Sequence, residues 1–350
     1  MTRRVVFRRF GEVDVLEVEE TIVRKPGPGE LRIATAFAGV NYADVIARRG
    51  FYKWAPPFPT CVGFELSGTV VEVGEGVTSH TVGDRVAAVT RFGGYADEIV
   101  VEAARAWKVP DGMRLEDAAA IPAVYITAWQ SLMEVARIRA GDTVLIQAVA
   151  GGVGLAALQL AKKVGLRTYG TASSEEKLEL ARAHGLDHGI DYVRLDFEQE
   201  ITRLTNGRGV DFVLDSLGGT GLRKGYRCLA RGGLVVTIGA AGVAPPSRDP
   251  VSFLRAGVEL VKGGVYHPFQ LIEDNRGIAG VQVLLLWDDL PRLDRAMARI
   301  FEWWREGAIK PHVDRIVPLA DARDAHRALE SRKTRGKLLL ACAGAAGGAG

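Results

Sequence analysis

TVLIQAVAGGVGLAALQLAKKV, residues 143–164, is the stretch that decides the fold. It begins with an apolar run, Thr143 to Gln147, that is typical of a buried strand. It ends with apolar residues at helical spacing, from Leu155 to Val164. The loop between them, Ala148 to Gly154, departs from the strict G-x-G-x-x-G pattern because residue 149 is valine. Its small residues still permit a tight turn and leave helix N–H groups to bind phosphate, so the stretch predicts a dinucleotide-binding unit.

Strand-like and helix-like segments continue to alternate as far as about Gly264. This alternation predicts a doubly wound parallel sheet of the α/β class. Further strands are expected at 167–171, 211–215 and 233–238, and further helices at 174–184 and 221–231.

The first 120 residues instead carry short β-prone runs separated by Gly, Pro and Asp turns, which predict a small antiparallel barrel. A last strand, 336–340, fits that barrel best, so the α/β part is expected as an insertion. The expected domains are a β-rich barrel from 1–122 and 268–340, a Rossmann domain from 123–267, and a disordered Ala/Gly-rich tail from 341–350.

The composition excludes several classes of protein. The formal net charge of +3 gives no reason to expect nucleic acid or an anionic membrane as a partner. The chain has no run of 18 apolar residues that would predict a transmembrane helix, and its N-terminus lacks the apolar core of a secretory signal. The three cysteines are too widely separated for a disulfide framework or a paired-cysteine metal site. We therefore expect a cytoplasmic protein, and most simply an enzyme.

The end of the second Rossmann strand predicts which cofactor binds. An NAD enzyme is expected to carry an acidic residue there for the ribose 2′-hydroxyl. This chain has Ser173 and Ser174 instead, with Lys177 one turn into the next helix. Hydroxyls and a cation suit a 2′-phosphate, so the pattern favours NADPH over NADH.

Taken together, the layout from about residue 5 to 340 resembles the medium-chain dehydrogenase/reductase superfamily, in which a Rossmann domain interrupts a GroES-like barrel. Four segments resemble the quinone oxidoreductase (zeta-crystallin) branch: Gly39–Asp44, Gly63–Gly68, Ala148–Gly154 and Val210–Gly219. Two later segments, Asn275–Gly280 and Gly307–His312, are similar to the vesicle amine transport protein-like subgroup.

The resemblance, together with the loop, also implies which residues contact the cofactor. They are Asn41, Thr127, Ala150, Gly151, Gly152, Val153, Gly154, Thr171, Ser173, Ser174, Lys177, Tyr192, Ser216, Leu217, Gly239 and Ala240.

The same resemblance shows that zinc ligands are missing. Zinc alcohol dehydrogenases of this superfamily have cysteine where Asn41 stands and histidine where Phe64 stands, and the third ligand falls near Ala123-Val124. A catalytic zinc needs three protein ligands, so no metal is expected.

Without zinc, the feasible hydride acceptor is a conjugated C=C–C=O group, whose charge delocalises onto oxygen as an enolate. Tyr52 matches the tyrosine that enoyl-thioester reductases of the superfamily place beside the reacting group. Asn41 and Tyr42 are the other candidate catalytic residues. The simpler interpretation is that Tyr42 and Tyr52 are aromatic wall residues.

Three functions remain open: an NADPH-dependent reductase of quinones or enones, an enoyl-CoA or enoyl-thioester reductase, and a nucleotide-binding protein without turnover. Arg48, Arg49 and Lys53 suit a CoA phosphate, although a solvated surface is the simpler interpretation. The run 258–266 resembles an edge strand through which Rossmann domains pair, which predicts a homodimer.

Overall fold

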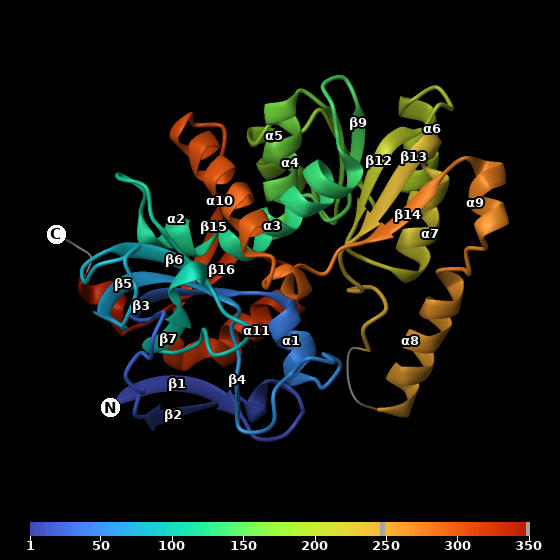
Figure 1. The fold of residues 1–350 in the computed structure, drawn as a ribbon. Helices are drawn as coiled ribbons and strands as arrows, with labels where there is room; N and C mark the ends of the chain where they lie inside the picture. The colour runs from blue at the N-terminus through green and yellow to red at the C-terminus, as the bar shows by residue number, and fades with distance from the viewer. Residues whose placement is uncertain (246–248, 348–350) are drawn as a thin grey trace. The chain divides into compact units, whose positions relative to one another are not determined.

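The computed structural model describes residues 1–245 and 249–347 of the protein, which forms two compact units. Unit 1 comprises Met1–Ile126, Leu284–Arg305 and Lys310–Gly350, and unit 2 comprises Thr127–Val283 and Glu306–Ile309. The chain therefore leaves unit 1, builds most of unit 2 and returns, as the colour sequence in Figure 1 shows.

Unit 1 is built on β-sheets with mostly antiparallel pairing. Its long central strand, β3, pairs with β5, β7 and β16, and the larger sheet has the order β15-β16-β3-β5-β6-β8. A smaller sheet has the order β2-β1-β4. The antiparallel pairing of β16 with β3 places the last strand in the barrel domain, as expected. The strands are β1 (Thr2–Phe7), β2 (Glu17–Thr21), β3 (Glu30–Val40), β4 (Thr60–Cys61), β5 (Glu65–Val73), β6 (Arg85–Val89), β7 (Glu98–Glu102), β8 (Ala106–Lys108), β15 (Val313–Pro318) and β16 (Lys337–Ala341).

Among the helices that accompany these sheets, α10 buries one apolar face. In α10, the buried positions are spaced by three and four residues, which is the pattern of an amphipathic helix. They are Leu293, Ala296, Met297, Ile300 and Phe301. The helices are α1 (Tyr42–Arg48), α2 (Leu115–Ala119), α3 (Pro122–Trp129, which crosses the boundary between the units), α10 (Leu290–Arg305) and α11 (Ala322–Glu330), with 3-10 turns at Val13–Val15, Ala103–Arg105, Val283–Leu286, Leu319–Asp321 and Ala343–Gly347.

Unit 2 contains the predicted doubly wound sheet. All of its strands are parallel, in the order β11-β10-β9-β12-β13-β14. The order reverses direction between β9 and β12, which is where open α/β sheets bind ligands. The strands are β9 (Thr143–Ile146), β10 (Arg167–Ala172), β11 (His188–Asp191), β12 (Val210–Asp215), β13 (Leu229–Thr237) and β14 (Gly277–Gly280).

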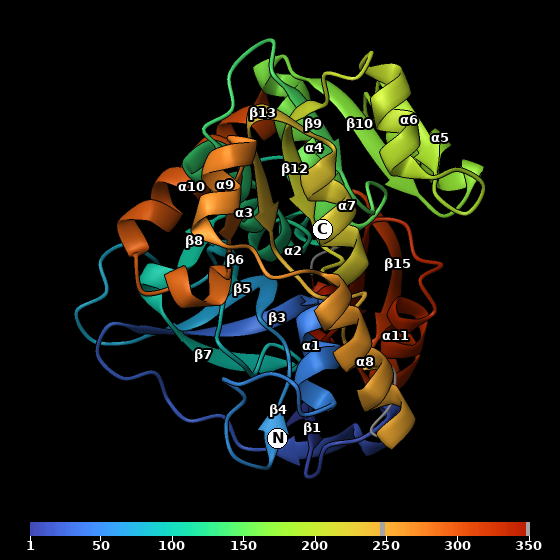
Figure 2. The same ribbon diagram turned by 90° about the vertical axis from the view of Figure 1, so that its right-hand side faces the viewer.

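Helices cover both faces of this sheet, with α4 and α5 on one side and α6 and α7 on the other (Figure 1). Tyr226 of α7 and Phe197 and Ile201 of α6 join strand residues in one buried cluster. Helices α7 and α8 are neighbours, as Figure 2 shows. The helices are α4 (Gly152–Val164), α5 (Glu175–Ala183), α6 (Phe197–Leu204), α7 (Gly219–Arg227), α8 (Pro250–Lys262) and α9 (Pro268–Asp274), with a π-helical segment at Gln130–Ala136.

Three expectations differ from the structure. The run 258–266 is not an edge strand: its first half is the end of α8, and the outer strand of the sheet is β14. Strand β14 also lies beyond residue 267, where the Rossmann domain was expected to end. In the Ala/Gly-rich tail, Ala341 completes β16 and residues 343–347 form a 3-10 turn, while residues 348–350 lie outside the described residues.

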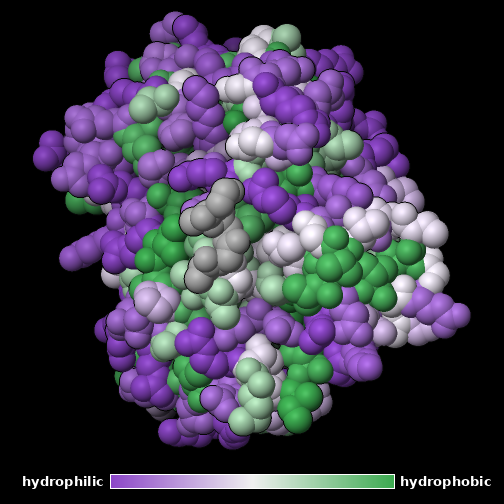
Figure 3. Space-filling view, turned by 90° about the vertical axis from the view of Figure 1, so that its left-hand side faces the viewer, coloured by the Kyte–Doolittle hydropathy of each residue, from purple (hydrophilic) through white to green (hydrophobic). Residues whose placement is uncertain are grey.

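The surface drawn in Figure 3 is mostly hydrophilic, with hydrophobic residues gathered in separate patches. The largest run of exposed apolar side chains in unit 2 comes from α8, α9 and the segment between them. Among the described residues, none of the helices is both long enough and apolar enough to cross a membrane. The exposed apolar residues of α8, α9 and the segment between these helices are Val251, Phe253, Leu254, Val258, Leu260, Val261, Val265, Phe269 and Ile272.

Candidate active site

The loop that the sequence predicts to bind phosphate lies between the end of β9 and the start of α4. Ala148 turns the chain with a φ of 50°, and Ala150 is buried. Gly154 packs against the loop so closely that a Cβ there would lie 2.7 Å from the carbonyl oxygen of Val149, and closer still to that of Ala148. Gly151, Gly152 and Val153 lie at the start of α4, where the first N–H groups of a helix have no carbonyl partner within the helix.

Thr171 holds this loop in place from the neighbouring strand. Its hydroxyl accepts a hydrogen bond from the Ala148 N–H at 3.3 Å, and its carbonyl accepts one from the Val149 N–H at 3.0 Å. The side chain is buried. Thr171 was predicted to contact the cofactor, and the structure shows it supporting the loop.

The residues predicted to select NADPH gather where β10 and β11 end. Ser174 precedes the first residue of α5, and Lys177 lies in the first turn of that helix. The Tyr192 N–H donates to the Ala172 carbonyl at 3.1 Å, which brings half-exposed Tyr192 to the same edge as the two serines.

An acidic residue that the sequence analysis did not consider also lies at this edge. Asp191 ends β11 and pairs in register with Ala172. Its carboxylate accepts a hydrogen bond from the Val193 N–H at 3.0 Å and lies 3.5 Å from the Arg194 guanidinium. Only strand pairing reveals this neighbour, because it is far from Ser173 in sequence.

Two further predicted segments meet at the ends of β12 and β13. The Ala241 N–H donates to the Ser216 carbonyl at 3.2 Å, and the Gly242 N–H donates to the Leu217 carbonyl at 2.8 Å. Gly239 and Ala240 therefore lie beside the segment that follows β12. These four predicted residues belong to one local structure.

Asp215 organises these two segments. Its side chain is fully buried and accepts hydrogen bonds from the Leu217 and Gly218 N–H groups at 3.2 and 3.1 Å, and from the Thr237 hydroxyl at 2.8 Å. Burial raises the pKa of this carboxyl above its usual range. One signal in the sequence could have identified Asp215, because it is a charged residue at the end of an apolar strand.

Thr127 lies in α3, and its carbonyl accepts a hydrogen bond from the Ser131 hydroxyl at 2.7 Å. In unit 1, Asn41 precedes α1 and is half-buried. Its side-chain nitrogen donates to Glu65 at 2.9 Å, and its side-chain oxygen accepts from the Lys337 ammonium at 2.6 Å. Tyr42 is the first residue of α1, and burial raises the pKa of its phenol.

Asp44, also on α1, connects two segments of the site. Its carboxylate accepts hydrogen bonds from the Asn41 N–H at 2.8 Å, the Gly63 N–H at 3.0 Å and the Tyr95 hydroxyl at 3.0 Å. Burial raises its pKa to about 7. The Tyr95 hydroxyl also lies 3.3 Å from Nε2 of buried His326, whose pKa burial lowers to about 3.

Tyr52 lies in an aromatic cluster. Its ring centroid is 5.5 Å from that of Trp54, 5.7 Å from that of Phe64 and 6.2 Å from that of Phe92. Burial raises the pKa of its phenol to about 12, so the hydroxyl keeps its proton at neutral pH. The rings fit the role of an aromatic wall, and the protonated hydroxyl fits that of a donor.

Arg48 and Arg49 do not form a solvated surface. Both side chains are buried, and both guanidinium groups contact Glu330, at 2.8 Å for Arg49. Arg48 also lies 3.3 Å from His326 Nδ1. The interpretation as a solvated surface is wrong for these two residues, and Lys53 is the exposed member of the three.

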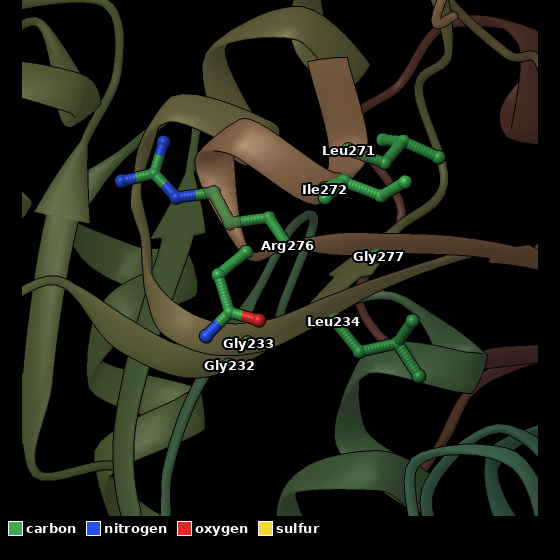
Figure 4. Close-up of a pocket in the computed structure, with 8 residues that line it drawn as sticks. Gly232, Gly233, Leu234, Leu271, Ile272, Arg276 and Gly277 are labelled. Atoms are coloured by element: carbon green, nitrogen blue, oxygen red, sulfur yellow. The ribbon is translucent and has the colours of Figure 1, made fainter. Parts of the chain in front are cut away.

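No group of three or more His, Cys, Asp and Glu side chains suited to a metal ion occurs in the described ranges. A cavity of about 460 Å³ lies in unit 2 beside the middle of β13 and the start of β14 (Figure 4). The phosphate-binding loop follows the other end of a strand in the same parallel sheet, so this cavity is not the nucleotide site. It is lined by Gly232, Gly233, Leu234, Leu271, Ile272, Asn275, Arg276 and Gly277.

A parallel sheet with a phosphate-binding loop, carried by a chain that also forms a β-rich barrel, defines a nucleotide-dependent dehydrogenase or reductase. Residues 27–111 match the alcohol dehydrogenase GroES-like domain, and residues 184–340 match the zinc-binding dehydrogenase family. A synaptic vesicle membrane protein VAT-1 homolog from Rattus norvegicus is 35% identical over 342 residues, which are 97% of this chain and 83% of that protein.

Solved structures agree with these matches. Escherichia coli quinone oxidoreductase complexed with NADPH has a TM-score of 0.85 at 28% identity, covering 97% of this chain and 99% of that one. The CurK enoyl reductase has a TM-score of 0.84 at 26% identity, with the same coverage of 97% and 99%. The chain belongs to the medium-chain dehydrogenase/reductase superfamily, within the group that includes quinone oxidoreductases and VAT-1 homologues. It is a nicotinamide-dependent oxidoreductase of that superfamily.

Proposed function

We propose that the protein reduces a conjugated C=C–C=O group, in a quinone or an enone, with NADPH and without a metal. The observation that carries this proposal is the Tyr52 hydroxyl, which keeps its proton in an aromatic cluster. Apolar rings favour a flat, conjugated acceptor, and a protonated phenol favours an acceptor that gains negative charge on oxygen.

The residues of unit 2 fit a nicotinamide nucleotide. Gly154 leaves the space beside the loop free of a Cβ, and the start of α4 offers N–H groups to a pyrophosphate. When bound, the nucleotide supplies the hydride. Ser173, Ser174 and Lys177 favour a 2′-phosphate, and a similar solved reductase is complexed with NADPH. The Asp191 carboxylate works against this preference, and Arg194 partly neutralises it.

The chemistry balances with one hydride and one proton. Hydride addition to the β-carbon of the acceptor leaves an enolate, whose oxygen needs a hydrogen-bond donor. The Tyr52 hydroxyl donates that hydrogen bond, or gives its proton to the α-carbon and recovers one from water. A quinone takes its proton on oxygen, readily from solvent, so it depends less on Tyr52.

Tyr52→Phe tests this role. We expect kcat for enone reduction to fall by about 10²- to 10³-fold with little change in the Kd for NADPH, the scale of losing one donor to a developing oxyanion. Quinone reduction should fall much less. Tyr266→Phe is the matched control, because it removes a phenol hydroxyl of unit 2 whose oxygen is buried and has no hydrogen-bond partner. Small and equal decreases of kcat with enones and with quinones would show that Tyr52 serves only as an aromatic wall residue.

The second candidate function is an enoyl-CoA or enoyl-thioester reductase, which the similarity to a solved enoyl reductase favours. A screen of NADPH oxidation with quinones, enones and short enoyl-CoAs separates the two. NADPH binding without turnover on all three would instead favour a nucleotide-binding protein that is not an enzyme. Tighter binding of NADH than of NADPH would refute the assigned cofactor preference.

We also propose a cytoplasmic homodimer. Among the described strands, β14 pairs only with β13, so its other edge is open. Open edges and exposed apolar residues, here those of α8 and α9, favour association with a second copy about a two-fold axis. Light scattering at micromolar concentration should give twice the chain mass of 37.7 kDa, and the mass of a single chain would refute the dimer.

A further inference from the structure

A buried ammonium group lies at the centre of a polar cluster in unit 1 that consists of Lys337, Glu65 and Asn41. Lys337, on β16, has a side chain only 4% exposed, and Glu65, on β5, is fully buried. The ammonium contacts the Glu65 carboxylate and donates to the Asn41 side-chain oxygen at 2.6 Å. Burying a lysine costs solvation free energy, which the chain recovers only through these partners.

Glu65 is held from three directions. Besides the Lys337 ammonium, it accepts a hydrogen bond from Asn41 Nδ2 at 2.9 Å and one from the Ala123 N–H, at the start of α3, at 2.7 Å. A Cβ on Gly39 would lie 2.6 Å from Glu65 Cγ, so the close approach of the carboxylate requires glycine there. The carboxylate is therefore fixed before any ligand arrives.

The Asn41 carboxamide therefore forms hydrogen bonds through both its oxygen and its nitrogen. Its oxygen faces the ammonium and its nitrogen faces the carboxylate, with a weaker contact of 3.4 Å to the Gly39 carbonyl. A flipped carboxamide would put its NH₂ group against the ammonium and its oxygen against the carboxylate. Both contacts are repulsive, so the cluster selects one orientation.

We infer that Lys337 is a positioning residue, which with Glu65 holds the Asn41 carboxamide in one orientation for the cofactor contact and catalytic role expected of Asn41. The role in turnover rests on the function proposed above, whereas the fixed orientation does not. Lys337 acts through Asn41 and contacts no reacting atom. An internal cation paired with Glu65 thus orients the residue that stands where related zinc enzymes have a ligand.

An NMR measurement tests the orientation without activity. The chain has three asparagines, Asn41, Asn206 and Asn275, so selective ¹⁵N-asparagine labelling gives three side-chain amide pairs, assigned with one substitution each. In the wild-type chain, we expect the Asn41 pair to exchange with water more slowly than that of exposed Asn206. In Lys337→Met, its exchange should accelerate about 10-fold or more.

Lys108→Met is the matched control, because Lys108 pairs with Asp84 at 2.9 Å on the surface of the same unit, and it should leave the Asn41 signals unchanged. If Lys337→Met alone fails to fold, the double variant with Glu65→Gln leaves no buried charge without a partner and takes its place. Unchanged exchange at Asn41 in a folded variant overturns the inference.

Turnover then tests the role of that orientation. We expect Lys337→Met to lower kcat by about 10- to 100-fold, and Asn41→Ala to do the same. If Lys337 acts through Asn41, the double variant should be no slower than the worse single variant, whereas multiplied losses would overturn the inference. A wild-type chain that reduces no acceptor refutes the proposed function instead, and the exchange measurement still decides the orientation.

Discussion

Gly154→Ala should weaken cofactor binding more than its size suggests. The added methyl group would lie 2.7 Å from the Val149 carbonyl oxygen and nearer still to that of Ala148. Both oxygens belong to the backbone of the phosphate-binding loop, so no flexible side chain can move aside. Either α4 shifts away from the loop by several tenths of an ångström, or the loop opens.

The cost follows from that geometry. Overpacking of this kind costs about 1–3 kcal/mol, and the N–H groups that we propose to bind phosphate move with α4. If the bound state bears this cost, the Kd for NADPH rises by about 5- to 150-fold. Quenching of tryptophan fluorescence by NADPH measures Kd, and urea denaturation measures the free energy of unfolding separately.

Gly257→Ala is the matched control. Gly257 lies within α8, and a Cβ there would have no atom within 4 Å. This substitution should leave Kd unchanged and stabilise the chain by about 0.5–1 kcal/mol, because alanine favours helix. An unchanged Kd in Gly154→Ala, with the variant folded, would refute the argument that close packing at residue 154 shapes the phosphate site.

Two further predictions concern buried carboxyl groups. Burial raises the Asp44 pKa from 3.8 to about 7, so the folded chain binds this proton more tightly than the unfolded chain does. The contribution of Asp44 to the free energy of unfolding therefore falls as pH rises from about 4 to about 7. The unfolding free energy of the wild type relative to Asp44→Asn should therefore fall across that range, and a difference independent of pH would contradict the shift. Asp215→Ala should cost about 2–4 kcal/mol in urea denaturation, because it leaves two partly buried N–H groups without their carboxylate partner, and a loss below about 1 kcal/mol would show that water replaces the carboxylate.

Local pattern alone was sufficient for β9, β10, β12 and β13, for α4, α5 and α7 and for the loop of the α/β unit, whereas β11, β14, α6, α8 and α9 were not predicted. The apolar run at 143–146 and the helical spacing after Gly154 are set by short-range sterics and by the need to bury one face, so the sequence contains them directly. The same holds for the serines after β10, which follow a predicted strand end. The prediction of an edge strand at 258–266 was wrong. Val258–Val261 has a β-prone composition, yet these residues continue helix α8, which begins at Pro250.

The polar cluster of unit 1 was decided by tertiary structure. Lys337 and Asn41 are nearly 300 residues apart, and only the antiparallel pairing of β16 with β3 brings them together. Sequence spacing carries no information on such a contact, because it depends on which strand edges pair. Arg48 shows the same limit, since its pairing with Glu330 turns an apparently solvated charge into a buried one. Long-range pairing, rather than residue type, decides which charges are buried and which side chains they orient.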